Sequence, residues 1–156
     1  MKWKQTILAT IAVAMHDLNL TQAKLSDAAY LYNTERPLVV SHRGSTGHFP
    51  EHSVGAYADA YYSGADFVEL DVQMTSDGYL VTNHDPCLKE TTNVEDYSDL
   101  YQDRRKTKTV QPGDHHYTRD FFFDDFTLAE VKALKRKQRF ANRSQKMDGV
   151  FEVLTV

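Results

Sequence analysis

The sequence predicts an α/β fold, because a strand, a helix and a second strand follow one another in its first half. The run at residues 38–40 is short and apolar, as in a buried strand. Ser53 is placed to cap a helix that runs to about Ser63, after which Gly64 supplies a left-handed stop. Residues 66–72 carry the second strand pattern. A strand–helix–strand unit of this kind joins parallel neighbours in one sheet.

The composition is that of one soluble globular unit of 156 residues. Aromatic residues make up 12% of the chain, which argues against disorder. The longest apolar run, residues 7–15, is far short of the roughly 20 residues that cross a bilayer, so no stable membrane span is predicted. The single Cys87 cannot form an intrachain disulfide and therefore says nothing about the redox compartment.

Charge is distributed unevenly around the net value of −4. Residues 1–100 carry 6 Lys or Arg against 14 Asp or Glu, whereas residues 101–143 carry 11 against 6. The acidic part suits a bound cation. The basic part lacks the interleaved aromatic residues that stack on bases, so it is interpreted as a solvated face and no nucleic-acid partner is predicted.

The N-terminus has the features of a secretory signal. Two lysines precede a short apolar core at residues 6–15, and Ala12 and Ala14 form a small-x-small cleavage site. We therefore predict a signal peptide and leader over residues 1–23 and a secreted or periplasmic protein. The alternative interpretation is an ordinary N-terminal amphipathic helix.

The pair Asp77 and Gly78 lies between two apolar runs and predicts a β-hairpin. The connection is too short for a parallel crossover, so the third strand, residues 79–85, should return antiparallel to the second. Folding the chain about this turn places His84 roughly opposite Asp71, within a register shift of one or two residues.

The second half of the chain begins with residues 91–120, which lack clear periodicity and predict an ordered insertion or a long loop. Thr127 and Glu130 are spaced as a capping box, and the helix that follows is predicted to run to about Arg139. A turn then leads into residues 150–156.

Glu69 and Asp71 stand two positions apart on the second strand, so their carboxylates point to the same side, with Cα atoms about 7 Å apart. Two unpaired carboxylates that face an interior are costly unless a counter-charge is present. A divalent cation is the simplest counter-charge, and oxygen ligands without Cys or His at zinc spacing indicate a hard ion, Mg²⁺ or Ca²⁺. The alternative is an acidic sheet edge that faces solvent.

His42 and His84 each end a strand beside a charged neighbour. A single histidine of this kind is usually structural, but two of them flanking a pair of carboxylates supply a general acid and a general base. Arg43 adds a guanidinium that suits phosphate oxygens. Together with a cation, these residues point to phosphodiester cleavage, in which one histidine activates the nucleophile and the other protonates the leaving oxygen.

Five ordered blocks resemble the N-terminal signature of glycerophosphodiester phosphodiesterases: His-Arg-Gly at 42–44, Pro-Glu-His-Ser at 50–53, the strand at 64–72, Thr-Ser-Asp-Gly at 75–78 and His-Asp-Pro at 84–86. The chain also resembles the secreted or periplasmic subgroup, which carries a long insertion, in further blocks at 125–132, 137–140 and 148–152. Residues 37–156 are therefore interpreted as a phosphodiesterase domain.

The resemblance implies a TIM-barrel-type fold, that of the PLC-like phosphodiesterases. It implies hydrolysis of glycerophosphodiesters, small molecules of glycerol and lipid metabolism, to sn-glycerol 3-phosphate and an alcohol. It also implies a divalent cation, Ca²⁺ rather than Mg²⁺, held by Glu69 and Asp71. His42 and His84 are assigned as the catalytic acid/base pair, and Arg43 as a contact to the substrate phosphate.

One block departs from the family pattern. The family form of Pro-Glu-His-Ser is Pro-Glu-Asn-Thr, so His52 and Ser53 replace Asn and Thr, although Ser53 still suits a helix cap. His48, His52, His115 and His116 are interpreted as solvated loop histidines rather than as a further metal site.

The length also departs from the family, because a (β/α)₈ barrel takes about 250 residues. The family's third metal carboxylate would lie beyond Val156, and Glu152 is not taken as its replacement. The chain is therefore interpreted as the N-terminal part of a barrel. Two other functions stay open: a related phospholipase acting on lysophospholipid or sphingomyelin, and a catalytically inactive fragment that binds phosphate or a partner. The sequence predicts no particular oligomeric state.

Overall fold

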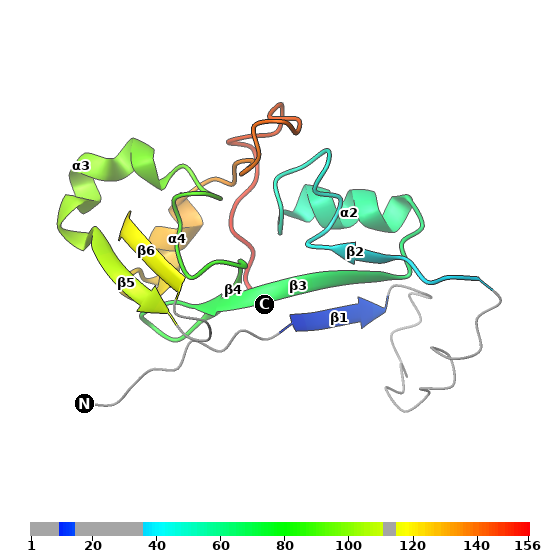
Figure 1. The fold of residues 1–156 in the computed structure, drawn as a ribbon, viewed down its shortest axis with the longest axis horizontal. Coiled ribbons are helices and arrows are strands. Elements are labelled where there is room, and N and C mark those ends of the chain that lie inside the picture. The colour runs from blue at the N-terminus through cyan, green and yellow to red at the C-terminus, as the bar shows by residue number, and fades with distance from the viewer. Residues whose placement is uncertain (1–9, 15–35, 111–114) are drawn as a thin grey trace.

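The structure, a computed structural model, describes residues 10–14, 36–110 and 115–156. Its main sheet is built around the strand β3 (Phe67–Met74). This strand pairs in parallel with β2 (Val40–His42) and antiparallel with β1 (Thr10–Ala14) and β4 (Leu80–Thr82). Helix α2 (Val54–Tyr62) lies along β2 and β3 (Figure 1). The predicted parallel strand–helix–strand unit and the antiparallel hairpin are both confirmed.

Helix α2 begins and ends where the sequence predicts. The Ser53 hydroxyl accepts a hydrogen bond from the amide of Ala56 and caps the first turn. The helix ends at Ser63, and Gly64 follows in the left-handed region with φ 83°. Near the start of the helix, Gly44 passes so close that an added Cβ would lie 2.7 Å from Ala56 Cβ. This close approach seats α2 against the turn that follows β2.

Strand β2 is not buried, contrary to the prediction for the apolar run at residues 38–40. Val39 and Val40 are 53% and 54% exposed. Among the described residues, β2 has a hydrogen-bonded neighbour only on the β3 side, so its other edge is open. For the same reason the described sheet is not closed into a barrel.

The β3–β4 hairpin turn spans the three residues 76–78, with Gly78 in the left-handed region at φ 89°. A three-residue turn shifts the register by one position from the predicted two-residue turn. Asn83 rather than His84 therefore lies opposite Asp71, and the Asn83 amide donates to the Asp71 carbonyl at 3.0 Å. His84 follows in the loop after the strand.

In the part of the chain that the structure describes, residues 91–120 are ordered into short helical turns and a hairpin rather than one long loop. Short helical turns at Val94–Tyr97, Ser98–Tyr101 (α3) and Gln102–Arg104 lead into a hairpin of β5 (Lys106–Val110) and β6 (His115–Asp120), and a further turn follows at Phe123–Asp125. The main hydrophobic core lies at this end of the molecule and is built from Val81, Leu88, Val94, Tyr101, Phe121, Phe123, Phe126, Val131, Leu134 and Val153.

Helix α4 (Leu128–Ala133) has the predicted capping box but is shorter than predicted. The Thr127 hydroxyl accepts from the Glu130 amide, while the Glu130 carboxylate accepts from the Thr127 amide. The helix does not continue to residue 139 because the chain turns inward. Arg136 is fully buried and donates to Asn83 Oδ1 at 2.6 Å. Burial lowers the pKa of Arg136 to about 10, which still leaves it charged at neutral pH.

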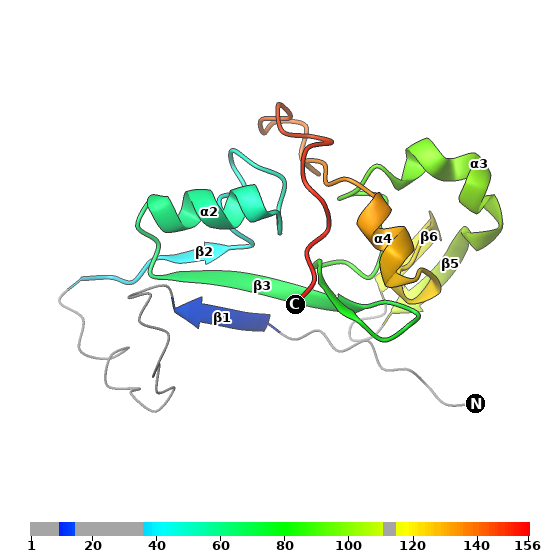
Figure 2. The same ribbon diagram turned by 180° about the vertical axis from the view of Figure 1, so that it is seen from behind.

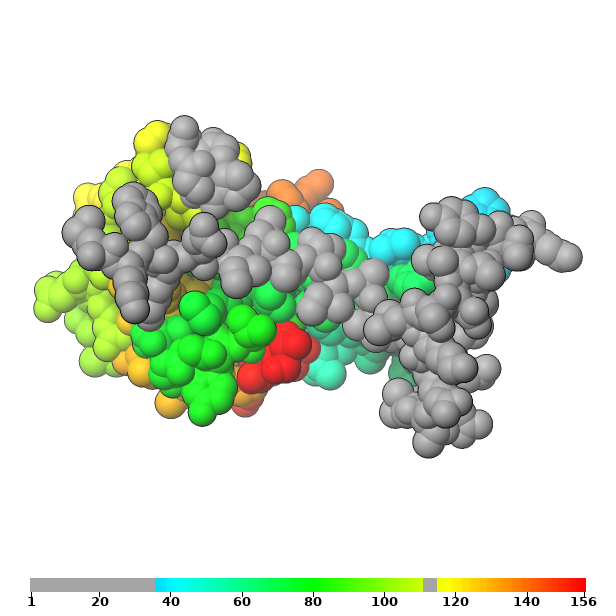
Figure 3. Space-filling model, turned by 90° about the horizontal axis from the view of Figure 1, so that it is seen from below, coloured from blue at the N-terminus to red at the C-terminus, as the bar shows by residue number. Residues whose placement is uncertain are grey.

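Residues 135–140, the extended segment after α4, lead into a turn-rich loop at residues 141–150, and the chain passes between the α2 end and the α4 end of the molecule (Figure 2). Lys135 forms a β-bridge with Glu152, and Val81 forms one with Thr155. The last residues therefore lie beside the β3–β4 hairpin, as the view from below shows (Figure 3).

Residues 10–14 form β1, in register from Thr10 opposite Asp71 to Ala14 opposite Phe67. The alternative prediction of an amphipathic helix is therefore wrong for these five positions. Residues 1–9 and 15–23 of the predicted leader lie outside the described residues, and the signal peptide stays a prediction. None of the helices in the described ranges has the length and apolar character of a membrane-spanning helix.

Candidate active site

The end of β2 lies directly against β3, and this pairing brings His42 opposite Glu69. His42 Nε2 is 4.0 Å from Glu69 Oε2, and the His42 side chain is 70% exposed. Glu69 and Asp71 are only 8% and 3% exposed. The alternative of a solvent-facing acidic edge is therefore wrong, and both carboxylates lie largely buried at the end of β2.

Arg43 contacts both carboxylates. It lies in the left-handed region, with φ 61°, at the sharp turn after β2. Its backbone amide donates to Glu69 Oε2 at 2.9 Å, and its Nε lies 3.4 Å from Asp71 Oδ2. A residue other than glycine costs roughly 1 kcal/mol or more in this conformation, and these two contacts offset that cost. The predicted phosphate contact is thus held beside the predicted metal ligands.

His52 is the main correction to the sequence-based interpretation. The sequence predicts a solvated loop histidine, but the His52 side chain is fully buried. Its Nδ1 shares a 2.7 Å hydrogen bond with the Tyr57 hydroxyl, and its Nε2 lies 3.3 Å from Asp71 Oδ2. Burial lowers the pKa of His52 in spite of the neighbouring Asp71. The buried ring thus lies between Tyr57 and Asp71 and contacts both.

The other three histidines of that prediction are exposed, as expected. His48 Nδ1 lies 3.4 Å from Asp59 Oδ2, and His116 Nδ1 lies 2.8 Å from Thr109 Oγ1. His115 and His116 lie on strand β6 rather than in a loop, so the predicted loop position is wrong for these two and correct for His48.

The two buried carboxylates differ in how readily they ionise. Burial raises the pKa of Glu69, and the charge of Asp71 raises it further. Burial also raises the pKa of Asp71, but His52, His84 and Arg43 outweigh burial and bring that pKa below its ordinary value. Crowded carboxylates of this kind are stabilised by a divalent cation.

The donor set fits part of a hard-cation site. Asp71 Oδ2 is buried and receives no hydrogen bond of good geometry, although His52 Nε2 and Arg43 Nε lie 3.3 and 3.4 Å from it, so it has acceptor capacity left for such an ion. Within the described ranges, however, no group of three or more His, Cys, Asp or Glu side chains is arranged to hold a metal ion. In this part of the chain Glu69 and Asp71 thus do not make a complete ligand set by themselves.

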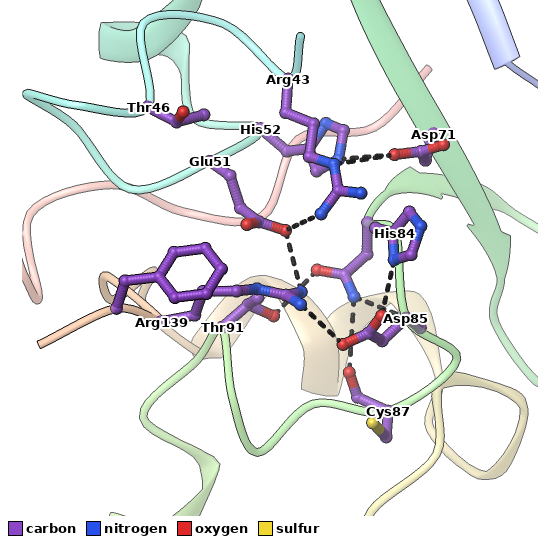
Figure 4. A network of polar contacts seen from close by, with 12 residues as sticks. Arg43, Thr46, Glu51, His52, Asp71, His84, Asp85, Cys87, Thr91 and Arg139 are labelled. Carbon is purple, nitrogen blue, oxygen red and sulfur yellow. Dashed lines mark hydrogen bonds and ion pairs between the residues drawn. The ribbon is translucent and has the colours of Figure 1, made fainter. Parts of the chain in front are cut away.

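His84 lies in the loop after β4, where a carboxylate orients its ring. Its Nδ1 contacts Asp85 Oδ1 at 2.6 Å, and its side chain is 37% exposed. Its carbonyl oxygen accepts from Gln73 Nε2 at 2.8 Å, and the buried Asn83 donates to the Asp85 carbonyl at 2.7 Å. The loop is thus held from several directions, and His84 shares one polar network with Arg43 (Figure 4).

Glu51 and Arg139, to which the sequence assigns no role, complete this network (Figure 4). Glu51 is 2% exposed, and its Oε1 accepts from Arg43 at 3.4 Å and from Arg139 at 2.9 Å. Arg139 also pairs with Asp85 at 3.0 Å. The predicted helix to Arg139 would have placed this side chain on a helix surface, whereas the extended segment brings it into the site.

A family model described as the glycerophosphoryl diester phosphodiesterase family matches residues 42–155. A glycerophosphodiester phosphodiesterase of Arabidopsis thaliana is 42% identical over 122 residues, which are 78% of this chain and 32% of that protein. A glycerophosphodiester phosphodiesterase of Bacillus subtilis is 41% identical over 92 residues, which are 58% of this chain and 31% of that protein. The chain thus spans about a third of the length of these curated relatives.

Solved structures agree with this match. A glycerophosphodiester phosphodiesterase of Agrobacterium tumefaciens superposes with a TM-score of 0.52 at 25% identity, over 78% of this chain and 40% of that one. A phosphodiesterase of Oleispira antarctica, in complex with the product sn-glycerol-3-phosphate, gives a TM-score of 0.52 at 25% identity, over 82% and 39%. The predicted TIM-barrel-type fold is confirmed, and the described residues form part of it. The chain therefore belongs to the glycerophosphoryl diester phosphodiesterase family.

Proposed function

We propose that this chain carries part of the active site of a divalent-cation-dependent hydrolase that cleaves glycerophosphodiesters to sn-glycerol 3-phosphate and an alcohol. The observation that supports it most directly is the register of β2 and β3. This register sets His42 and Arg43 against Glu69, with Asp71 two residues further along. The names of the relatives, and the product bound to one of them, support the substrate class.

His42 and His84 are the proposed acid/base pair. An ionised carboxylate only accepts hydrogen bonds, so contact with Asp85 places the proton of a neutral His84 ring on Nδ1. Nε2 of His84 then keeps its lone pair and is able to accept a proton. His42 is the more exposed of the two rings, beside Glu69. One ring takes a proton from the nucleophile and the other protonates the leaving oxygen.

Arg43 is the proposed contact to the phosphate oxygens, and Glu69 and Asp71 would hold the cation. The family generally depends on a divalent cation. We favour Ca²⁺ over Mg²⁺, because Ca²⁺ tolerates irregular oxygen geometry whereas Mg²⁺ demands a near-ideal octahedron. When bound, such an ion neutralises negative charge on the reacting phosphate. The chain's own contribution is to keep Arg43 in contact with both carboxylates, at 2.9 Å from Glu69 and 3.4 Å from Asp71.

The test is the release of glycerol 3-phosphate from glycerophosphocholine in millimolar Ca²⁺. Turnover is measured in a chimera in which residues 42–155 replace the matching segment of the Arabidopsis relative. We expect turnover within about tenfold of that relative, and its loss on chelation of the cation.

Other outcomes identify the alternative functions. Hydrolysis of lysophospholipid or sphingomyelin, without hydrolysis of glycerophosphocholine, would replace the proposed substrate class with that of a phospholipase. Binding of glycerophosphocholine by calorimetry, without turnover of any of these substrates, would identify a binding fragment.

A secreted or periplasmic location is proposed from the predicted signal peptide within residues 1–23. Mature protein from its native host should begin after about Ala14 or Ala23 and lie outside the cytosol. Intact Met1 on cytosolic material, determined by N-terminal sequencing, would contradict the signal peptide.

A further inference from the structure

The extended segment after α4 supplies no residue to the proposed chemistry, yet its polar side chains reach both loops of the site. Gln138 is 5% exposed, and its Nε2 donates to the Thr46 and Phe49 carbonyl oxygens at 3.0 and 3.3 Å. Arg136 donates to Asn83 Oδ1 at 2.6 Å. The segment is therefore fixed to the loop before α2 and to the loop after β4.

Arg139 extends from this segment between two carboxylates. Its Nη2 donates to Glu51 Oε1 at 2.9 Å, and its Nη1 pairs with Asp85 Oδ2 at 3.0 Å. Those carboxylates in turn contact Arg43 at 3.4 Å and His84 at 2.6 Å. The Glu51, Arg139 and Asp85 side chains are 2%, 14% and 14% exposed. A series of alternating charges thus links Arg43 to His84 through the interior (Figure 4).

We propose that Arg139 is a positioning residue for the phosphodiesterase reaction, because it holds Asp85 against His84 and Glu51 against Arg43. Its catalytic meaning rests on the proposed function, whereas the contacts themselves are independent of turnover. A guanidinium presents several donors in a rigid plane and so binds two carboxylates at once, which a single ammonium does with less fixed geometry. Removal of Arg139 takes a cationic partner from the largely buried Asp85 and leaves the buried Glu51 with Arg43 alone.

Asp85 transmits the effect of Arg139 to His84. Burial raises the pKa of Asp85, but the hydrogen bond with His84 and the charge of Arg139 outweigh burial and lower it. The ionised carboxylate accepts a hydrogen bond from Nδ1–H of the neutral His84 ring. Without Arg139, Asp85 is free to reorient, and the preference of the ring for the Nδ1–H tautomer weakens.

The direct test is the tautomer of His84, read from the ring ¹⁵N chemical shifts of the 156-residue chain. The parent should show the Nδ1–H form, and Arg139→Gln should show a mixture with the Nε2–H form. Arg143→Gln is the matched control, because Arg143 donates to the Thr46 carbonyl rather than to a carboxylate, and it should resemble the parent. Arg139→Lys keeps the charge, and its proportion of the Nε2–H tautomer should lie between those of the parent and Arg139→Gln. This variant preserves the test if Arg139→Gln does not fold.

Turnover in the chimera supplies the second readout. Arg139→Gln should lower kcat by about 10- to 100-fold, the cost of misplacing a reacting group by about 1 Å. It should have little further effect on an Asp85→Asn background, because the two residues act through one contact. A correctly folded parent chimera without turnover, together with an altered tautomer in Arg139→Gln, would disprove the proposed function and still support the role of Arg139 in orienting the His84 ring. An unchanged His84 tautomer in both Arg139 variants would overturn the positioning role. Independent effects of Arg139→Gln and Asp85→Asn, which multiply in the kcat of the double variant, would overturn it as well.

Discussion

A single methyl group at Gly44 tests how α2 fits against the turn that carries Arg43. Gly44 has φ 86°, and an added Cβ would lie 2.7 Å from Ala56 Cβ and 2.8 Å from the Ala56 backbone carbon. A helix backbone cannot move aside as a flexible side chain does. Gly44→Ala should therefore displace either α2 or the turn beside it.

Gly64 provides the matched control, because it has a similar φ of 83° but an added Cβ meets nothing within 4 Å. A left-handed φ costs alanine roughly 1–2 kcal/mol, and the less flexible unfolded chain offsets about 0.4–1 kcal/mol of this. Gly64→Ala should thus lower the free energy of unfolding by about 1 kcal/mol. Gly44→Ala adds overpacking of about 1–3 kcal/mol, for a total of about 2–4 kcal/mol.

Urea unfolding followed by far-ultraviolet circular dichroism measures both free energies. The same two substitutions are then made in the chimera to measure the consequence for the site. Gly44→Ala should lose turnover because it displaces the neighbouring Arg43, whereas Gly64→Ala should keep turnover. Equal free energies of unfolding for the two variants would refute the close packing of Gly44 on Ala56.

Substitutions in the proposed site should separate proton transfer from cation binding. His42→Ala and His84→Ala should each lower kcat of the chimera at least about 100-fold with Ca²⁺ affinity retained, by steady-state kinetics and calorimetry; near-parent turnover would remove that residue from the mechanism. Glu69→Gln and Asp71→Asn should weaken Ca²⁺ binding, because each removes a charged oxygen ligand but keeps its shape; unchanged activation in a Ca²⁺ titration would contradict their role. Arg104 pairs with Glu130 at 2.7 Å, and its hydrogen bond lowers the pKa of Glu130 from 4.5 to about 2. The stabilisation that the ionised Glu130 carboxylate provides is therefore complete above pH 4.5 and is lost as the pH falls to about 2. Glu130→Gln should flatten that part of the stability curve in urea unfolding, and a curve identical to the parent's would show that this carboxylate contributes nothing.

The elements that could be predicted from the sequence are those with local signals. The Ser53 cap and the Gly64 stop act within one helical turn, and the structure places both as predicted. Side chains alternate along a strand, so Glu69 and Asp71 were predicted on one face of β3. The predicted parallel pairing with β2 was then sufficient to place both near His42. These relationships span few residues or follow from strand geometry alone.

The mispredicted parts depend on partners that are distant in sequence. The contact of Arg136 with Asn83 joins residues 53 positions apart and ends α4 before the predicted Arg139. His52 has the appearance of a loop residue because nothing near it in the sequence reveals its contact with Asp71. In such cases tertiary contacts decide the local conformation, and periodicity does not report them.

Turnover of glycerophosphocholine by the chimera tests most directly whether these residues form part of a phosphodiesterase site. In millimolar Ca²⁺ the chimera should release glycerol 3-phosphate and should lose this activity on chelation and in His84→Ala. The 156-residue chain alone should release less than about a tenth as much, because Glu69 and Asp71, the proposed ligands, are joined by no third metal-ligating side chain among the described residues. A correctly folded chimera that releases no glycerol 3-phosphate, while the Arabidopsis relative does so under the same conditions, would contradict the proposed site.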